Sequence, residues 1–365
     1  MASIQDKIRE IEEEIARTQY NKATEHHIGV LTAKLARLRK ELEARSAKKG
    51  GGKGFAIKKE GDATVILLGF PSVGKSTLLS KLTSKQSRVG SYEFTTLDTI
   101  PGMLHYEGFD IQILDIPGII EGASKGKGRG KEVLSAARSA DLFLILLDAK
   151  NAIKQFNAIK KELHRAGFRV NQQPADVHIE KTSQGGIAVM GRGSTGITKK
   201  TIATILNEFS IHNARVVVNE EITPEQLVDV LAGNRKYLKA LYVINKADLL
   251  TTGEKEELSD FFGGDVLFIS AENGEGLEEL KSKILENLSL IRVFTMDDFG
   301  HVDRERPLIL KKGQTIAEVA KKIHRDLLKN FRYAQVWGPS AKFPGQKVGL
   351  DHKVADGDVV FVRGK

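Results

Sequence analysis

The N-terminal segment alternates apolar and charged positions with the period of an α-helix. Ser3 and Asp6 have the spacing of a capping box at its start. The first apolar stripe consists of Ile4, Ile8, Ile11 and Ile15, and the second of Ile28, Leu31, Leu35, Leu38 and Leu42. Because the polar residues 21–27 lie between the stripes, the pattern predicts a helical hairpin. The Gly- and Lys-rich residues 47–54 then predict a flexible basic linker.

Beyond residue 60 the pattern changes to short apolar runs that alternate with amphipathic helical segments. The apolar runs are 63–68, 102–106, 109–114, 142–147, 240–244 and 266–270. Helical spacing occurs after residue 75, across 153–163, near 254–262 and at 277–288. Uninterrupted apolar runs between helices are typical of buried parallel strands. The pattern therefore predicts an α/β fold with a doubly wound sheet.

Two further segments depart from this alternation. Residues 170–235 contain strand-like runs at 177–181, 186–190 and 214–218 and helices at 198–209 and 223–231, which predicts an inserted α/β subdomain. After residue 292 a strand, a Gly turn, an amphipathic helix and a closing strand predict a compact β-grasp module. Trp337 and the histidines of this module are interpreted as packing or surface residues. The predicted domains are 1–54 (hairpin and linker), 55–169 with 236–292 (sheet domain), 170–235 (insertion) and 293–365 (β-grasp).

Composition restricts the function classes. The chain has 365 residues, 41% hydrophobic and 28% charged, and no cysteine, which excludes disulfides and thiolate metal sites. No apolar run approaches the roughly 18 residues of a membrane span, and the N-terminus lacks a signal core, so we expect a cytoplasmic protein without a membrane partner. The net charge of +9 favours RNA or a ribonucleoprotein as partner, although lysines also serve solubility.

The segment after the first apolar run fits the phosphate-binding pattern G-x-x-x-x-G-K-[ST]. In such a loop, backbone N–H groups and the helix N-terminus surround the phosphates. Lys75 is expected to reach the β- and γ-phosphates and to assist catalysis, and Ser76 to bind Mg²⁺. The predicted nucleotide-binding residues of the loop are Pro71, Ser72, Val73, Gly74, Lys75, Ser76 and Thr77.

Two later positions are expected to sense the third phosphate. Asp115 ends an apolar strand and begins D-I-P-G, where a carboxylate can hold a Mg²⁺-bound water and the Gly118 amide can meet the γ-phosphate. Without the upstream loop this motif would be an ordinary Pro-Gly turn. Thr96, in the polar stretch before the second strand, is the expected further Mg²⁺ ligand. The alternative is that Thr95 and Thr96 only begin a β-strand.

The sequence Asn245-Lys246-Ala247-Asp248 directly follows a strand and predicts guanine recognition. The Asp248 carboxylate can accept hydrogen bonds from the ring N–H and amino group of guanine, whereas adenine would leave it unpaired. Such a site can discriminate by roughly 10⁴- to 10⁵-fold. After the next strand, Ser270, Ala271 and Glu272 are expected to close over the base through backbone amides. Bound GTP or GDP is the predicted ligand.

These motifs occur in the order GFPSVGKST, FTTL, DIPG, NKAD and SAE, which resembles the Obg-like branch of the translation-factor-related GTPases. With the helical N-terminus, the insertion and the C-terminal module, the whole chain resembles the developmentally regulated GTP-binding (DRG) family. The resemblance implies that the β-grasp module is a TGS domain and that the insertion resembles a ribosomal-protein fold. It also implies a link to ribosomes and translation.

Two positions depart from common GTPase patterns. Where many GTPases have a water-orienting Gln after the Gly of the second switch, this chain has Ile119, as its Obg-like relatives have an apolar residue. Hydrolysis should therefore be slow, on the order of 10⁻⁴ to 10⁻² s⁻¹. Some related GTPases hold K⁺ with an Asn where this chain has Ser72, so K⁺ stimulation is an open alternative that turnover in KCl and NaCl would decide.

The first functional hypothesis is a molecular switch that hydrolyses GTP to GDP and phosphate and acts on ribosomes or translation. The alternative is a ribosome- or RNA-binding scaffold whose nucleotide is structural, which is motivated by basic residues in the hairpin, the linker and the segment with Lys125, Lys127, Arg129 and Lys131. A regulatory protein partner remains open. An ATP-dependent small-molecule kinase is disfavoured by the guanine-recognition motif.

Overall fold

A computed structural model describes residues 3–19, 21, 23–49, 60–83, 100–116, 136–191 and 196–364. By their internal contacts the residues divide into two compact units. The first unit spans residues 1–54 and 163–237, and the second spans residues 55–162 and 238–365. Among the described helices, none combines the length and the apolarity needed to cross a membrane.

The second unit is built on a mainly parallel sheet with the order β11-β10-β4-β1-β3-β2. Its strands are β1 (Ala63–Leu68), β2 (Ile100–Tyr106), β3 (Phe109–Asp115), β4 (Leu142–Asp148), β10 (Ala240–Asn245) and β11 (Leu267–Phe268). Only β2, which pairs with β3, runs antiparallel among these described strands. Every residue of β1 is buried, as expected for a central strand with helices on both faces. The predicted doubly wound sheet is confirmed.

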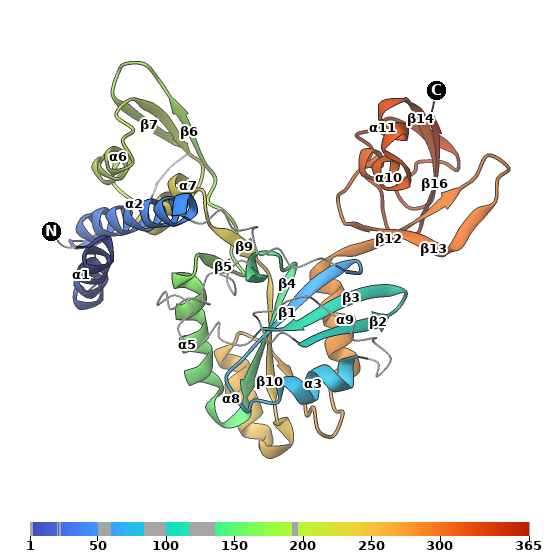
Figure 1. Cartoon of the computed structure of the whole chain (residues 1–365), viewed down its shortest axis with the longest axis horizontal. Helices are drawn as coiled ribbons and strands as arrows, with labels where there is room; N and C mark the ends of the chain where they lie inside the picture. The colour runs from blue at the N-terminus through green and yellow to red at the C-terminus, as the bar shows by residue number, and fades with distance from the viewer. Residues whose placement is uncertain are drawn as a thin grey trace. The chain divides into compact units, whose positions relative to one another are not determined.

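Helices cover both faces of this sheet (Figure 1). Helices α3 (Lys75–Leu82) and α9 (Leu277–Leu288) lie on one face, where Leu78 and Leu280 join Val65 in the core. Helices α5 (Ala152–Arg165) and α8 (Thr252–Phe261) belong to the other face. There the rings of Phe156 and Tyr242 meet edge to face, 5.1 Å between centroids. Short 3₁₀ turns, Ala149–Asn151 and Ala247–Leu249, follow β4 and β10.

In the first unit, the N-terminal hairpin and the insertion share one core. The hairpin consists of α1 (Ile4–Arg17), which begins with the predicted capping box, and α2 (Glu25–Lys49). The insertion consists of β6 (Val177–Lys181), β7 (Ile187–Gly191), α6 (Lys199–Glu208), β8 (Ala214–Val218) and α7 (Pro224–Ala232), with the sheet order β6-β8-β7. Ala33 and Ala36 of α2 are buried in the same cluster as Ile202 and Leu227. The small side chains of α2 thus permit close packing against α6 and α7.

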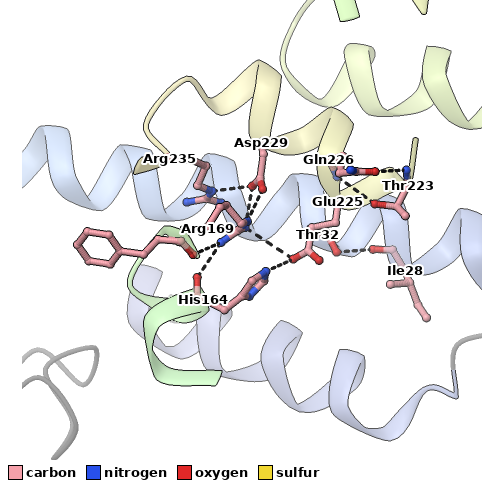
Figure 2. Close-up of polar contacts among 10 residues, drawn as sticks. Ile28, Thr32, His164, Arg169, Thr223, Glu225, Gln226, Asp229 and Arg235 are labelled. Carbon is pink, nitrogen blue, oxygen red and sulfur yellow. Dashed lines mark hydrogen bonds and ion pairs between the residues drawn. The ribbon is translucent and has the colours of Figure 1, made fainter. Parts of the chain in front are cut away.

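A buried cluster of charges lies where the chain enters and leaves the insertion (Figure 2). There β5 (Phe168–Val170) pairs with β9 (Lys236–Leu238). Arg169, which is 3% exposed, donates to both carboxylate oxygens of Asp229 at 2.5 and 2.8 Å. Arg235 donates to the same carboxylate at 2.7 Å. Burial opposes the ionisation of nearby Glu225, but its hydrogen bond with His164 and the arginine charges leave its pKa lowered.

The C-terminal module has a sheet with the order β13-β12-β16-β14-β15. Its elements are β12 (Leu290–Met296), β13 (Val302–Lys311), α10 (Ile316–Ile323), α11 (Arg325–Lys329), β14 (Phe331–Trp337), β15 (Gln346–Val348) and β16 (Asp358–Gly364). Val293, Val336 and Val360 pack against Ile316 and Val319 of α10. The expected amphipathic helix divides at His324, which adopts an extended backbone conformation.

Candidate nucleotide site

The loop between β1 and α3 is anchored by one side chain and exposes its tip. Val73 is 1% exposed and belongs to the core, whereas Pro71 and Ser72 are exposed. Ser72 and Gly74 have positive φ angles of 62° and 94°. A Cβ on Gly74 would lie 2.3 Å from Nδ2 of Asn245, so this position requires glycine. The loop therefore curls sharply before α3, whose first N–H groups receive no side-chain cap from Gly74.

The Lys75 ammonium group lies over this loop. It donates to the carbonyl oxygens of Gly69 and Phe70 at 3.1 and 3.0 Å. Ser76 is exposed beside it, and Thr77 is partly buried. A cation held above an uncapped helix N-terminus, with an exposed hydroxyl next to it, is suited to bind phosphate and a phosphate-bound cation.

Asp115 lies at the same edge of the sheet, beside Leu67 in the register of β1 and β3. It is 8% exposed, and its Oδ1 atom has no hydrogen-bond partner within the described part of the chain. Burial raises the pKa of Asp115, while the positive charge of Lys75 opposes that shift. A buried carboxylate oxygen that lacks a partner fits the role of accepting from a hydrated divalent cation. The donor set of Ser76 and Asp115 is therefore compatible with Mg²⁺.

Asn245 connects the phosphate loop to the segment after β11. Its Nδ2 atom donates to the Val73 carbonyl at 2.8 Å, and its Oδ1 atom accepts from the Ala271 N–H at 2.9 Å. Asn245 is 3% exposed and Ala271 is 1% exposed, so both hydrogen bonds lie away from solvent. From the sequence, the Ala271 amide was expected to contact the nucleotide base. In the structure it donates to the side chain of Asn245. Ser270 is buried beside it and Glu272 is exposed.

Lys246 and Asp248 extend from the same turn. Lys246 has a positive φ of 63°, and its ammonium group donates to the Ser72 carbonyl at 3.1 Å. The same group donates to Asp148 Oδ2 at 2.7 Å. Asp248 is exposed, and its side chain makes no hydrogen bond with any other residue that the structure describes. Its carboxylate is therefore available to a ligand. It belongs to the same turn as Asn245 and Lys246, which contact the phosphate loop.

Asp148 is a part of this arrangement that the sequence analysis missed. It ends β4 and lies opposite Asn245 in the register of β4 and β10. The only sequence signal was an acidic residue directly after an apolar run. The expected Mg²⁺ ligand Thr96 and the expected γ-phosphate contact Gly118 lie outside the described residues, as do Thr95 and Ile119. Their roles remain predictions.

Comparisons with known proteins agree with this geometry. Residues 64–181 match the family model described as "50S ribosome-binding GTPase", residues 184–290 match its C-terminal region, and residues 291–362 match the TGS domain. An uncharacterised GTP-binding protein of Methanocaldococcus jannaschii is 51% identical over 98% of this chain and 92% of its own. Developmentally-regulated G-protein 3 of Arabidopsis thaliana is 45% identical over 99% of both chains. Developmentally-regulated GTP-binding protein 2 of Bos taurus is 43% identical over 98% of this chain and 99% of its own.

The sheet, the phosphate loop and the matched domains define a P-loop GTP-binding protein with a GTPase domain and a C-terminal TGS domain. Full-length similarity narrows the class further. The chain belongs to the developmentally regulated GTP-binding family, because relatives with that name share 43–45% of its residues over nearly the whole length. The family resemblance predicted from the motifs is confirmed.

Proposed function

We propose that this protein hydrolyses GTP slowly to GDP and phosphate and uses its nucleotide state to control binding to ribosomes or RNA. The observation that carries the proposal is the pair of buried hydrogen bonds through which Asn245 joins Val73 to Ala271. These bonds fix the phosphate loop and the base-recognition turn relative to each other. One side chain of that turn, Asp248, remains unpaired among the described residues and exposed for a guanine base.

In the proposed mechanism, Lys75 moves from the loop carbonyls to the β- and γ-phosphates. Ser76, Thr96 and Asp115 would hold Mg²⁺, which neutralises phosphate charge when bound. Thr96 and the Gly118 amide are proposed to follow the γ-phosphate and to be released after hydrolysis. Since Ile119 cannot orient the attacking water, we expect an intrinsic rate on the order of 10⁻⁴ to 10⁻² s⁻¹.

Exchanging Asp248 for Asn tests guanine recognition. The amide of Asp248→Asn offers a donor where guanine also donates, whereas xanthine has a carbonyl oxygen in place of the amino group. We expect GTP affinity to fall by about 10²-fold or more and xanthosine triphosphate to bind more tightly than GTP. Titration calorimetry measures both, and Asp260→Asn, at an exposed position of α8, is the matched control. Unchanged GTP affinity in Asp248→Asn would remove the assignment.

The family model's description and the net charge of +9 support a ribosome or RNA partner. We propose that the protein meets this partner in the cytoplasm. Co-sedimentation with ribosomes in GDP and in a non-hydrolysable GTP analogue tests the switch, and Lys75→Ala serves as the nucleotide-free control. We expect association to differ at least about fivefold between the two nucleotides and to fall steeply with salt. Equal ribosome association with GDP and with the GTP analogue would favour the scaffold alternative. A regulatory protein partner would shift this ratio when added.

A further inference from the structure

One face of the sheet of the TGS domain packs against α10. Ala334 and Val336 of β14, both 0% exposed, point toward the core with Ile316 and Val319 of α10. Because side chains alternate along a strand, the neighbours of these residues lie on the opposite face. That face carries Phe294, Tyr333, Trp337 and Phe361, which together are called the aromatic face. All of them are partly exposed.

The strand register places these rings around Phe361. On β14, Gln335 lies directly opposite Phe361, and Tyr333 and Trp337 lie two residues to either side. Diagonal neighbours of this kind are about 7–8 Å apart. Phe294 of β12 pairs with Val359, two residues before Phe361, and therefore occupies a third diagonal position. The aromatic face thus offers separate rings on the central strands of the sheet.

Basic side chains lie close to the aromatic rings. The Arg304 guanidinium lies 5.9 Å from the centroid of Phe294, and the Lys347 ammonium lies 4.7 Å from that of Tyr333. Arg363 is opposite Tyr333 in register and forms an ion pair with Asp298. Across residues 290–364 there are 14 lysines and arginines and 9 aspartates and glutamates. The domain as a whole therefore carries an excess of positive charge, and three of its basic side chains, Arg304, Lys347 and Arg363, lie beside the rings.

We propose that the aromatic face binds single-stranded RNA. Bases would stack on Phe361 and its diagonal neighbours, while Arg304, Lys347 and Arg363 contact phosphates. The spacing of the rings suits unstacked bases, and open sheets with aromatic residues on central strands recognise RNA in this manner.

This inference rests on the RNA partner of the proposed function and not on GTP hydrolysis. Duplex RNA keeps its bases stacked inside and offers none to the rings. The face should therefore prefer single strands, and binding should weaken as salt rises because phosphates are neutralised. The end of the sheet that carries Arg292 is excluded from the site, since that side chain contacts Glu107 and the ring of Phe109.

The test measures fluorescence anisotropy of a labelled single-stranded RNA of about twelve nucleotides with the full chain. Phe361→Leu and Tyr333→Leu keep apolar volume but lose the π-face. Each should weaken binding about tenfold, and Phe361→Tyr should retain it. Phe299→Leu, at the β12–β13 turn and 87% exposed, is the control and should stay within about twofold.

If Phe361→Leu fails to fold, Lys347→Gln still tests the face, because Lys347 is exposed. This variant should bind about threefold more weakly and show a smaller salt slope. Wild-type RNA affinity in both leucine variants, equal affinity for duplex RNA, or no RNA binding by the full chain would each overturn the proposal. GTP affinity, measured in the same samples, stays unchanged, so a failure of the GTP site is recognised separately.

Discussion

Gly74 occupies a position where backbone conformation and a neighbouring side chain both demand glycine. Its φ is 94°, and a Cβ would lie 2.3 Å from Nδ2 of Asn245. Gly74→Ala should lower the free energy of unfolding by about 1–3 kcal/mol and weaken GTP binding at least about tenfold. The control is Gly108→Ala, since Gly108 has a φ of 82° but no atom within 4 Å of the added carbon. It should cost about 1 kcal/mol without affecting GTP. Equal GTP affinities in the two variants would contradict the proposed geometry.

At the scale of single residues, the sequence predicts those functional residues that belong to continuous motifs. Sequence analysis identified Lys75, Asn245 and Asp248 because each belongs to a short motif that follows a strand and whose spacing indicates a chemical role. Asp148 was not, because its contact with Lys246 depends on β4 and β10 being neighbours in the sheet. That pairing joins segments almost a hundred residues apart, and no local pattern encodes it.

At the scale of elements, we expect the stability of the paired strands β5 and β9 to depend on the buried ion cluster beside them (Figure 2). Asp229 forms ion pairs with both Arg169 and Arg235, so Asp229→Ala would leave the buried Arg169 and the partly buried Arg235 without this carboxylate. We expect a loss of about 3–5 kcal/mol in the urea-unfolding free energy of the first unit. Glu180→Ala removes the exposed partner of Arg215 and should change it by less than about 1 kcal/mol. If both variants lost similar amounts of unfolding free energy, the burial of the Asp229 ion pairs would not be what stabilises the β5–β9 pair.

The elements with long periodic patterns were predicted within a few residues. The strands at 142–148 and 240–245 and the helix at 277–288 follow from apolar runs and helical spacing. The strands β5 and β9 span three residues each, which is too short for a period to show. The aromatic face was missed for a related reason: Trp337 was interpreted as a packing or surface residue because the register of β14 and β16 is not local.

For the whole molecule, the hairpin could be predicted but its partner could not. Two basic residues of its second helix make contacts that no local pattern shows: Arg37, which stays exposed, contacts Glu208 of the insertion, and the partly buried Arg39 contacts Glu12 of α1. A helical stripe predicts that a face is buried without identifying what covers it. The core that Ala33 and Ala36 share with α6 and α7 accordingly emerges only from the structure.

Discrimination between purine nucleotides tests the central claim most directly. Titration calorimetry with Mg²⁺ compares GTP and ATP binding to the full chain. Because guanine alone supplies two donors to Asp248, we predict that GTP binds roughly 10⁴-fold more tightly than ATP. Equal affinities for the two nucleotides would contradict the account.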